Sequence, residues 1–344
     1  MPPSRQVECT LVIAEPDGST LVTVVIAMRN EEAQIGACLE SVLASVLPHG
    51  RMECLVLDGD SRDDSVKIVA AVAARDPRVR LIANPDLLQA AAFNRGLAEA
   101  RGRYLVRMDA HSTYAPDYIA ECVRLLEETG AANVGGVQHA SGTDAVTAAI
   151  AAAVSSPFAA GDASYRHATR PGWVDTVYLG AWRTDTLRQL GGMRTDLAVN
   201  EDYELNVRLR KAGGRIYLSP TVRSTYYVRA SLPKLTRQYA RYGFWKVRTL
   251  VDHPGSLRWR QLVAPAFVLS VLLTPILVSR LGAIGALHLG LYAAANIAAS
   301  VVVAARSSWR NLPVLPAVFA IIHVSWGAGF WAGIVRWGTL RWTR

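Results

Sequence analysis

The stretch Cys54-Leu55-Val56-Leu57-Asp58-Gly59-Asp60-Ser61-Arg62-Asp63 says most about the fold of this 344-residue chain. Its first four residues are apolar throughout, as in a parallel strand that is buried on both faces, and acids follow at once. Residues 103–108, which are apolar apart from two arginines, also read as a buried strand, with Asp109 directly after them. Ligands of an open α/β sheet bind outside the carboxyl ends of its strands, and carboxylates there are costly to bury without a metal or polar ligand. These acids therefore predict a ligand site at a sheet edge.

Strand and helix patterns alternate on both sides of that stretch. We expect strands at residues 21–27, 53–57, 79–82, 103–108 and 132–137. We expect helices at residues 35–46, 63–74, 88–100, 115–128, 143–154, 184–190 and 201–212, and a loop at 155–172. The β-α-β-α order predicts an α/β fold with a mostly parallel, Rossmann-like sheet and right-handed crossovers.

The chain changes character after Gln261. Hydrophobic residues make up 51% of the chain, and their excess lies in three apolar stretches at 262–279, 281–305 and 312–335. A membrane-spanning helix needs about 20 residues, so the second and third stretches are long enough. The first is marginal and contains Pro265 and Pro275, so a tilted, kinked or re-entrant segment is an alternative. We expect a membrane domain at 261–336 with about three helices, followed by a basic tail at 337–344.

Charge and termini suggest where this domain sits. Residues 1–20 lack a signal-peptide pattern, so we expect a multi-pass protein of the cytoplasmic membrane whose soluble part faces the cytoplasm. Three complete crossings would place Arg336 outside, against the positive-inside tendency, whereas Arg306 inside agrees with it. One segment that does not fully cross removes the conflict.

The net charge of +9 and the cysteines exclude other classes of protein. The arginines are dense around the apolar tail, where anionic lipid headgroups are a simpler partner than nucleic acid, and no nucleic-acid-binding motif accompanies them. Cys9, Cys38, Cys54 and Cys122 lie far apart without CxxC spacing, so we expect free thiols and neither disulfides nor a zinc site.

Residues 231–251 predict an amphipathic helix between the two parts, within a linker at 231–260. Ser231 is a suitable cap, and Pro233 fits the first turn. Basic residues share one face of this helix: Lys234, Arg237, Arg241 and Arg248. A helix lying in the membrane interface fits this pattern, and an ordinary surface helix is the alternative.

The strand end at Asp109 also offers a metal site. Residues two apart on an extended chain point the same way, so Asp109 and His111 can address one point. A carboxylate and an imidazole are suitable ligands for Mn²⁺ or Mg²⁺, and such a cation would stabilise a diphosphate leaving group. The alternative is that Asp109 only caps the next helix and His111 is a solvated loop residue.

Five short motifs in order make the chain resemble the inverting family 2 glycosyltransferases of the GT-A fold, which use nucleotide-sugar donors. They lie at residues 25–32, 57–63, 92–102, 190–193 and 200–205. The resemblance runs from about Thr23 to Ile216 and implies a GT-A catalytic domain at 1–230. The Asp-Ala-His sequence at 109–111 is similar to a subset that makes bacterial exopolysaccharide units and carries C-terminal membrane segments.

The resemblance also implies roles for single residues. Glu31 and Asp58 match nucleoside-contacting positions, Asp58 typically at a uracil, which favours a UDP-sugar donor. Asp109 matches the first acid of an Asp-x-Asp motif that binds the metal and the nucleotide, and His111 departs from the second. Supporting positions are Asn30, Asp60, Asn94 and Glu201.

Asp202 matches the catalytic base, which takes the proton of the acceptor hydroxyl. The alternative is that Glu201 and Asp202 only favour a helix N-terminus electrostatically, which could hold for Glu201. Arg237 and Arg241 are candidates for diphosphate or headgroup contacts. The Gln-x-x-Arg-Trp motif of processive members has no match, which favours transfer of a single sugar.

These observations lead to one main hypothesis and three alternatives. The main one is a membrane-attached glycosyltransferase that extends a lipid-linked polyprenyl acceptor in cell-surface polysaccharide synthesis. An inactive scaffold within a polysaccharide assembly complex is favoured only by His111, and Asp58, Asp109 and Asp202 oppose it. A processive synthase is opposed by the missing motif, and a transporter by the small number of apolar segments.

Overall fold

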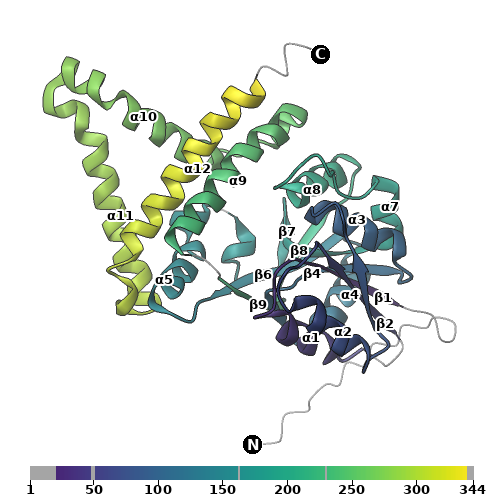
Figure 1. The fold of residues 1–344 in the computed structure, drawn as a ribbon. Coiled ribbons are helices and arrows are strands. Elements are labelled where there is room, and N and C mark those ends of the chain that lie inside the picture. The colour runs from purple at the N-terminus through teal and green to yellow at the C-terminus, as the bar shows by residue number, and fades with distance from the viewer. Residues whose placement is uncertain (1–20, 48–50, 162, 229–230, 339–344) are drawn as a thin grey trace, which may run out of the picture.

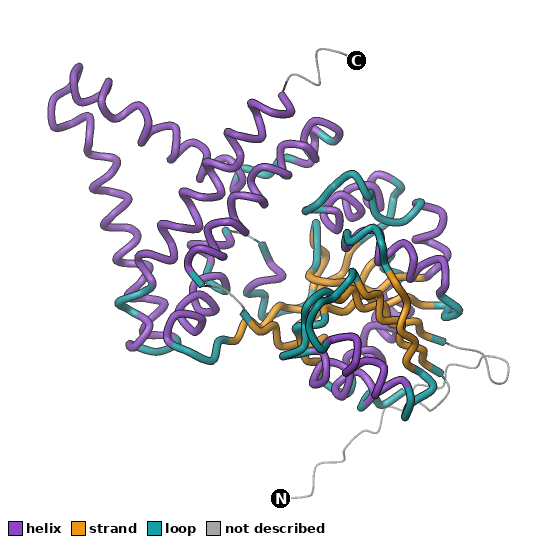
Figure 2. Tube along the Cα trace, viewed as in Figure 1, coloured by secondary structure: helices purple, strands orange, loops and turns teal. Residues whose placement is uncertain are grey.

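The computed structural model describes residues 21–47, 51–161, 163–228 and 231–338 (Figure 1). A mixed sheet flanked by helices forms one half of the molecule, and long helices form the other (Figure 2). Cys9 and the tail from residue 339 lie outside the described residues.

A nine-stranded sheet has the order β3-β2-β1-β4-β8-β6-β9-β5, and β7 pairs with β9. Its strands are β1 (Val22–Met28), β2 (Met52–Asp58), β3 (Val79–Ala83), β4 (Tyr104–Asp109), β5 (Ser112–Tyr114), β6 (Asn133–Ser141), β7 (Gly172–Val174), β8 (Tyr178–Arg183) and β9 (Ile216–Tyr227). Strands β1 to β4 are parallel, and β8 runs antiparallel between β4 and β6. The carboxyl ends of β2, β1 and β4 therefore meet at one edge.

Eight α-helices precede α9 in the described residues, and six of them cover the two faces of the sheet. The six are α1 (Ile35–Leu43), α2 (Ser65–Ala73), α3 (Gln89–Glu99), α4 (Tyr118–Thr129), α7 (Thr184–Leu190) and α8 (Glu201–Lys211), and the other two are α5 (Ala145–Val154) and α6 (Pro157–Ala160). One buried cluster joins α1, α2 and α4 to the sheet, and another joins α3, α7 and α8 to it. The free thiols expected at Cys38, Cys54 and Cys122 are confirmed, and all three are buried.

The sequence-based elements differ from the structure mainly after residue 110. The helix expected at 115–128 begins at Tyr118, and the expected loop at 155–172 contains α6 and a 3-10 turn at Ser164–Arg166. Strands β5, β7, β8 and β9 were not predicted. Two of them have only three residues, and β9 contains Pro220, which weakens a strand pattern.

The second half consists of α9 (Leu232–Asp252), α10 (Arg260–Leu281), α11 (Leu287–Arg306) and α12 (Leu315–Trp337). Glycines let α9 and α12 approach closely: a Cβ at Gly329 would lie 2.0 Å from the carbonyl oxygen of Ala240, and one at Gly243 would lie 2.1 Å from that of Trp326. Helix α5 packs on the same helices. A segment of the sheet half is thus built into the helical half.

Two apolar helical runs, Arg260–Arg306 and Leu315–Trp337, are long and apolar enough to cross a membrane. The three predicted apolar stretches correspond to α10, α11 and α12. Helix α10 continues through Pro265 and Pro275, so the prolines do not end it. Helices α10 and α11 meet at a short turn and form an arm that extends away from the sheet (Figure 1).

Candidate active site

Strand register brings the predicted acids to one edge of the sheet. Met28 at the end of β1 is paired with Asp58 on β2, and Ala27 is paired with Asp109 on β4. Glu31 follows β1 directly and is buried. Three acids separated by up to 78 positions in the chain therefore gather where parallel strands end.

The loops beside Asp58 are held by side-chain hydrogen bonds. Asn30 donates its backbone N–H to Ser61 Oγ (2.9 Å), and its Oδ1 accepts from the backbone N–H of Arg62 (2.8 Å). Asn30 and Asp60 both have positive φ, 56° and 58°, which short polar residues tolerate better than most. Asp58 Oδ1 is buried and makes no hydrogen bond in the structure. Asn30 thus links the loops after β1 and β2 beside a carboxylate oxygen that has no hydrogen-bond partner among the described residues.

Asn94, expected as a supporting residue, links two of the sequence motifs. Its Nδ2 donates to the carbonyl oxygen of Met193 (2.7 Å), and its Oδ1 accepts from the Met193 backbone N–H (2.7 Å). Gly192 has φ 69°, and a Cβ there would lie 2.3 Å from Asn94 Oδ1. Asn94 and Gly192 therefore form a connection between α3 and the turn after α7.

Asp109 and His111 lie at the end of β4 as expected. Asp109 is buried, and its Oδ2 accepts a hydrogen bond from the Tyr178 hydroxyl (3.0 Å). His111 Nδ1 lies 3.5 Å from Oε1 of Glu31 and is buried without a hydrogen bond. Burial lowers the pKa of His111 against the opposing charge of Asp109, so the imidazole is neutral at pH 7.

This pair fits part of a divalent cation site. Within the described residues, no group of three or more His, Cys, Asp or Glu side chains could hold a metal. Mg²⁺ is commonly bound by only one or two carboxylates together with substrate phosphates. The buried, unbonded Nδ1 of a neutral His111 is a suitable ligand atom beside Asp109. A cation here would need oxygens from a diphosphate to complete its coordination.

Arg107 connects the strand end to the start of α8. Its guanidinium is buried, with Nη2 3.5 Å from Asp109 Oδ1 and Nη1 3.6 Å from Asp202 Oδ2. Burial disfavours its charge, but Asp109 and Asp202 outweigh this and raise the pKa of Arg107. The sequence analysis missed Arg107. Its position two residues before Asp109 on a strand was the available signal, because such residues share a face.

The two acids at the start of α8 have different environments. Asn200 precedes them with φ 67°, a left-handed conformation. Glu201 is buried, and burial together with the charge of Asp202 raises its pKa to about 7. The Asp202 side chain is 39% exposed and lies on the cavity described next. Both acids line this cavity, and Asp202 is the more exposed of the two.

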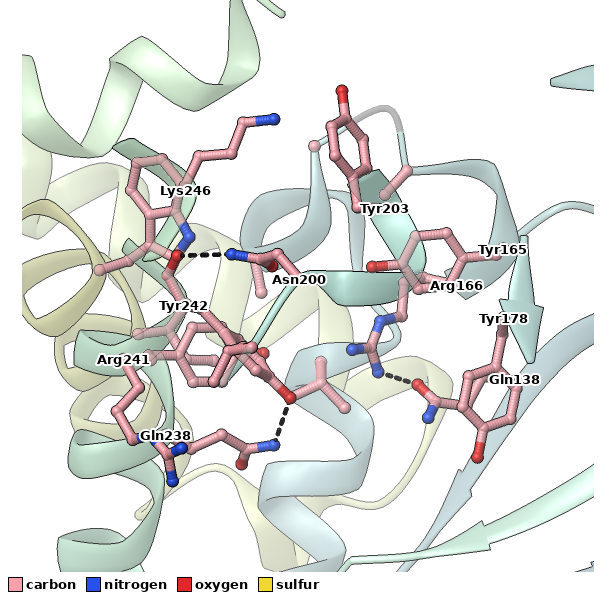
Figure 3. A pocket seen from close by; sticks show the side chains of 18 of the residues that line it. Gln138, Tyr165, Arg166, Tyr178, Asn200, Tyr203, Gln238, Arg241, Tyr242 and Lys246 are labelled. Carbon is pink, nitrogen blue, oxygen red and sulfur yellow. Dashed lines mark hydrogen bonds between the residues drawn. The ribbon is translucent and has the colours of Figure 1, made fainter. Parts of the chain in front are cut away.

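A cavity of about 1030 Å³ joins the sheet edge to the apolar helices. Asp109, His111 and Asp202 line one part of it. Apolar and aromatic side chains of the long helices line another part: Val263, Phe267, Tyr292, Ile322 and Trp326. Asn200 Nδ2 donates to the carbonyl oxygen of Tyr242 (3.2 Å), which ties α8 to α9 across the cavity (Figure 3).

Helix α9 contributes four cations to this cavity, Lys234, Arg237, Arg241 and Lys246. Arg237 and Arg241 were expected and are exposed, whereas Lys246 was missed and is buried. Lys246 follows Tyr242 by one helical turn and shares its face, and this spacing was the signal in the sequence.

Comparisons with known proteins give two family matches. Residues 23–161 match the model of Glycosyl transferase family 2, and residues 104–331 match that of Glycosyl transferase family group 2. The second match extends from β4 through most of α12, so it includes the apolar helices.

Two curated relatives cover nearly the whole chain. Succinoglycan biosynthesis protein ExoA of Rhizobium meliloti (strain 1021) is 32% identical, over 91% of this chain and 94% of its own. The dolichyl N-acetyl-alpha-D-glucosaminyl phosphate 3-beta-D-2,3-diacetamido-2,3-dideoxy-beta-D-glucuronosyltransferase of Methanococcus voltae is 24% identical, over 92% and 97%.

A solved mannosyltransferase from Pyrobaculum calidifontis, in complex with GDP-Man and Mn²⁺, has the same fold. Its TM-score is 0.62 at 19% identity, and the match covers 91% of this chain and 88% of that one. The predicted GT-A fold is confirmed.

Proposed function

Because the chain belongs to glycosyl transferase family 2, we propose that it is a membrane-attached inverting transferase with a lipid-linked acceptor. The donor is a nucleotide sugar, UDP-linked, and the acceptor is a glycan on a polyprenyl carrier. The product belongs to cell-surface polysaccharide synthesis.

The continuous cavity is the observation that carries this proposal. It places Asp202 in the same space as side chains of α10, α11 and α12 such as Phe267 and Trp326. A sugar acceptor on a water-soluble carrier would gain no binding free energy from the apolar side chains that share the cavity with Asp202. A carrier with a long apolar chain would bury apolar surface there, at about 25 cal/mol per Å².

Names of relatives support the same acceptor class. One is named for succinoglycan biosynthesis and another as a dolichyl-linked transferase. A third, from Pseudomonas aeruginosa, is named an undecaprenyl-phosphate transferase and matches over 30% of this chain.

In the proposed reaction, Asp202 takes the proton of an acceptor hydroxyl as its oxygen attacks the anomeric carbon. The bond from that carbon to the nucleoside diphosphate breaks, and the configuration inverts. Arg107 orients Asp202 through its Nη1. Glu31 and Asp58 bind the nucleoside, with Asp58 accepting from the base. A divalent cation at Asp109 and His111 would neutralise the diphosphate.

The proposal also assigns places to the parts of the chain. Residues 1–230 form the catalytic domain on the cytoplasmic side, and 231–260 lie at the interface with Arg237 and Arg241 facing headgroups. Residues 261–336 form the multi-pass membrane domain, and 337–344 the basic tail. Association with an assembly complex is compatible with this arrangement.

UDP release from a panel of UDP-sugars tests the proposal, with detergent-purified protein, Mn²⁺ or Mg²⁺, and native lipid extract as the acceptor source. We expect release that requires both metal and lipid and that is lost in Asp202→Asn, while UDP binding persists. UDP release at the same rate with and without lipid extract would contradict the proposal, and so would the absence of UDP binding with either metal.

A further inference from the structure

Lys246 is a buried lysine without a hydrogen bond. It is 4% exposed, lies on α9 and lines the cavity, and its Nζ makes no hydrogen bond. Nζ sits 3.6 Å from the centre of the Tyr203 ring, and Figure 3 shows the side chain extending from α9 toward that ring. A ring face compensates part of the loss of hydration of an ammonium group, but it replaces none of its three hydrogen bonds.

Its neighbours make the region more positive. Arg258 and Arg260 share one carboxylate, that of Asp175, at 3.1 Å and 3.3 Å. Arg210 on α8 adds a further positive charge that acts on Lys246. Burial, followed by the charge of Arg260, lowers the pKa of Lys246 to about 7. Among the described residues whose charges act on Lys246, three are arginines and one is an acid, Asp175, and this excess of positive charge favours a bound anion.

The position of this cluster suggests which anion. Arg260 is the first residue of α10 and of the apolar run Arg260–Arg306, so the cluster lies where the chain enters its apolar segment. Tyr203, which contacts Lys246, directly follows Asp202. An anion bound here is therefore at the start of the apolar helices and in the cavity that the proposed base also lines.

We propose that Lys246 and Arg260 form a binding site for the phosphate or diphosphate group of the lipid-linked acceptor. This inference rests on the proposed function, because it places that acceptor in the cavity. The donor diphosphate is assigned to Asp109 and His111 at the strand ends, whereas Lys246 and Arg260 belong to α9 and α10. Because Lys246 and Asp202 line the same cavity, a carrier phosphate held by Lys246 keeps its attached sugar in the space that Asp202 lines.

Binding of farnesyl diphosphate to the full chain in phosphatidylcholine nanodiscs tests the site, with farnesol, inorganic pyrophosphate and UDP as comparison ligands. Lys246→Met should weaken farnesyl diphosphate binding about 10- to 100-fold, the usual effect of losing a charge-assisted hydrogen bond. Lys246→Arg should keep most of the affinity. Lys67→Met should keep all of it, because Lys67 is 83% exposed on α2. UDP affinity should stay unchanged in all three variants.

Three outcomes would overturn the site. They are unchanged farnesyl diphosphate affinity in Lys246→Met, equal binding of farnesol, and a parallel loss of UDP affinity, which would assign Lys246 to the donor diphosphate. The melting temperature of Lys246→Met separates loss of the site from misfolding, since removal of a buried charge should not lower it. If the wild-type protein transfers sugar to lipid and Lys246→Met keeps wild-type farnesyl diphosphate affinity, the acceptor-phosphate site is refuted and the proposed function stands. Absence of UDP binding in the wild type would instead refute the proposed function.

Discussion

Two walls of the cavity differ in the balance of positive and negative side chains. On the strand-end wall, formed by Arg107, Asp109, His111 and Asp202, the positive Arg107 lies between two carboxylates. On the helix wall, formed by Lys246 and Arg260, the charges of three arginines and one aspartate among the described residues act on Lys246, whose Nζ makes no hydrogen bond. Charges of opposite sign balance one another around Arg107, although Arg107 Nη1 and His111 Nδ1 make no hydrogen bond, whereas an excess of one sign leaves capacity for a charged ligand. This difference agrees with the two proposed roles, catalysis at the strand-end wall and recognition of the acceptor phosphate at the helix wall.

The largest effect expected on the strand-end wall comes from Asp202→Asn. Loss of a general base should lower kcat about 100- to 10,000-fold, with UDP binding retained. Asp185→Asn is a matched control because Asp185 is 82% exposed on α7, and it should keep wild-type turnover. If kcat of Asp202→Asn stays within a few-fold of the wild-type value, Asp202 is not the general base.

Arg107→Met tests whether pairing stabilises the strand-end wall. Without the guanidinium, buried carboxylates of Asp109 and Glu201 lose their counter-charge, which typically costs about 3–5 kcal/mol of unfolding free energy. Denaturant titration measures the loss. Arg223→Met, which breaks an exposed pair with Asp117, should cost less than about 1 kcal/mol. Equal stabilities of the two variants would show that Arg107 is not the structural link described.

Variants of the exposed arginines of α9 test whether acceptor binding is specific to the helix wall or is a general property of a basic surface. Arg237→Gln and Arg241→Gln should each weaken binding to phosphatidylglycerol vesicles about five-fold, near 1 kcal/mol per charge. Farnesyl diphosphate affinity should change less than in Lys246→Met. Flotation measures vesicle binding, and titration measures farnesyl diphosphate affinity. A larger loss of farnesyl diphosphate affinity in the arginine variants than in Lys246→Met would assign acceptor binding to these arginines and not to Lys246.

A pH-dependent stability difference is expected at Lys246. The folded pKa is lowered to about 7 from an unfolded value near 10.5, so between these values the unfolded state binds more protons. Wild-type stability therefore gains from this group as the pH rises from 7 to 10.5. The melting temperature of Lys246→Met should exceed that of wild type by a few degrees at pH 6.5, and by less at pH 9.5. A constant difference at both pH values would contradict the lowered pKa.

The sequence predicted the strand-end wall far better than the helix wall. Asp58 and Asp109 follow short, mostly apolar strands, and local patterns of that kind indicate where parallel strands end. Lys246 depends on contacts with Tyr203 and on charges from α8 and α10, none of which is near it in sequence. Local periodicity placed it in an amphipathic helix but could not show that its face would be covered.

The same limit explains the missed strands and the location of α5. Strands β8 and β9 form through antiparallel and parallel pairing with β4 and β6, so their short or proline-containing patterns carry little signal alone. Helix α5 was expected as a helix, but its packing on α12 is a long-range contact. Asn94 was assigned a site role, and its link to Met193, 99 residues away, was not predictable from spacing.

Photo-crosslinking tests most directly whether the lipid-linked acceptor occupies this cavity. The probe is a polyprenyl diphosphate sugar with a diazirine near the head of its chain, added to the full chain in nanodiscs. We predict adducts on the cavity side of the helices, at Phe267 and Trp326, and competition by unlabelled carrier. Adducts confined to the exposed outer face of α10, at Leu272 and Ile276, would contradict the account.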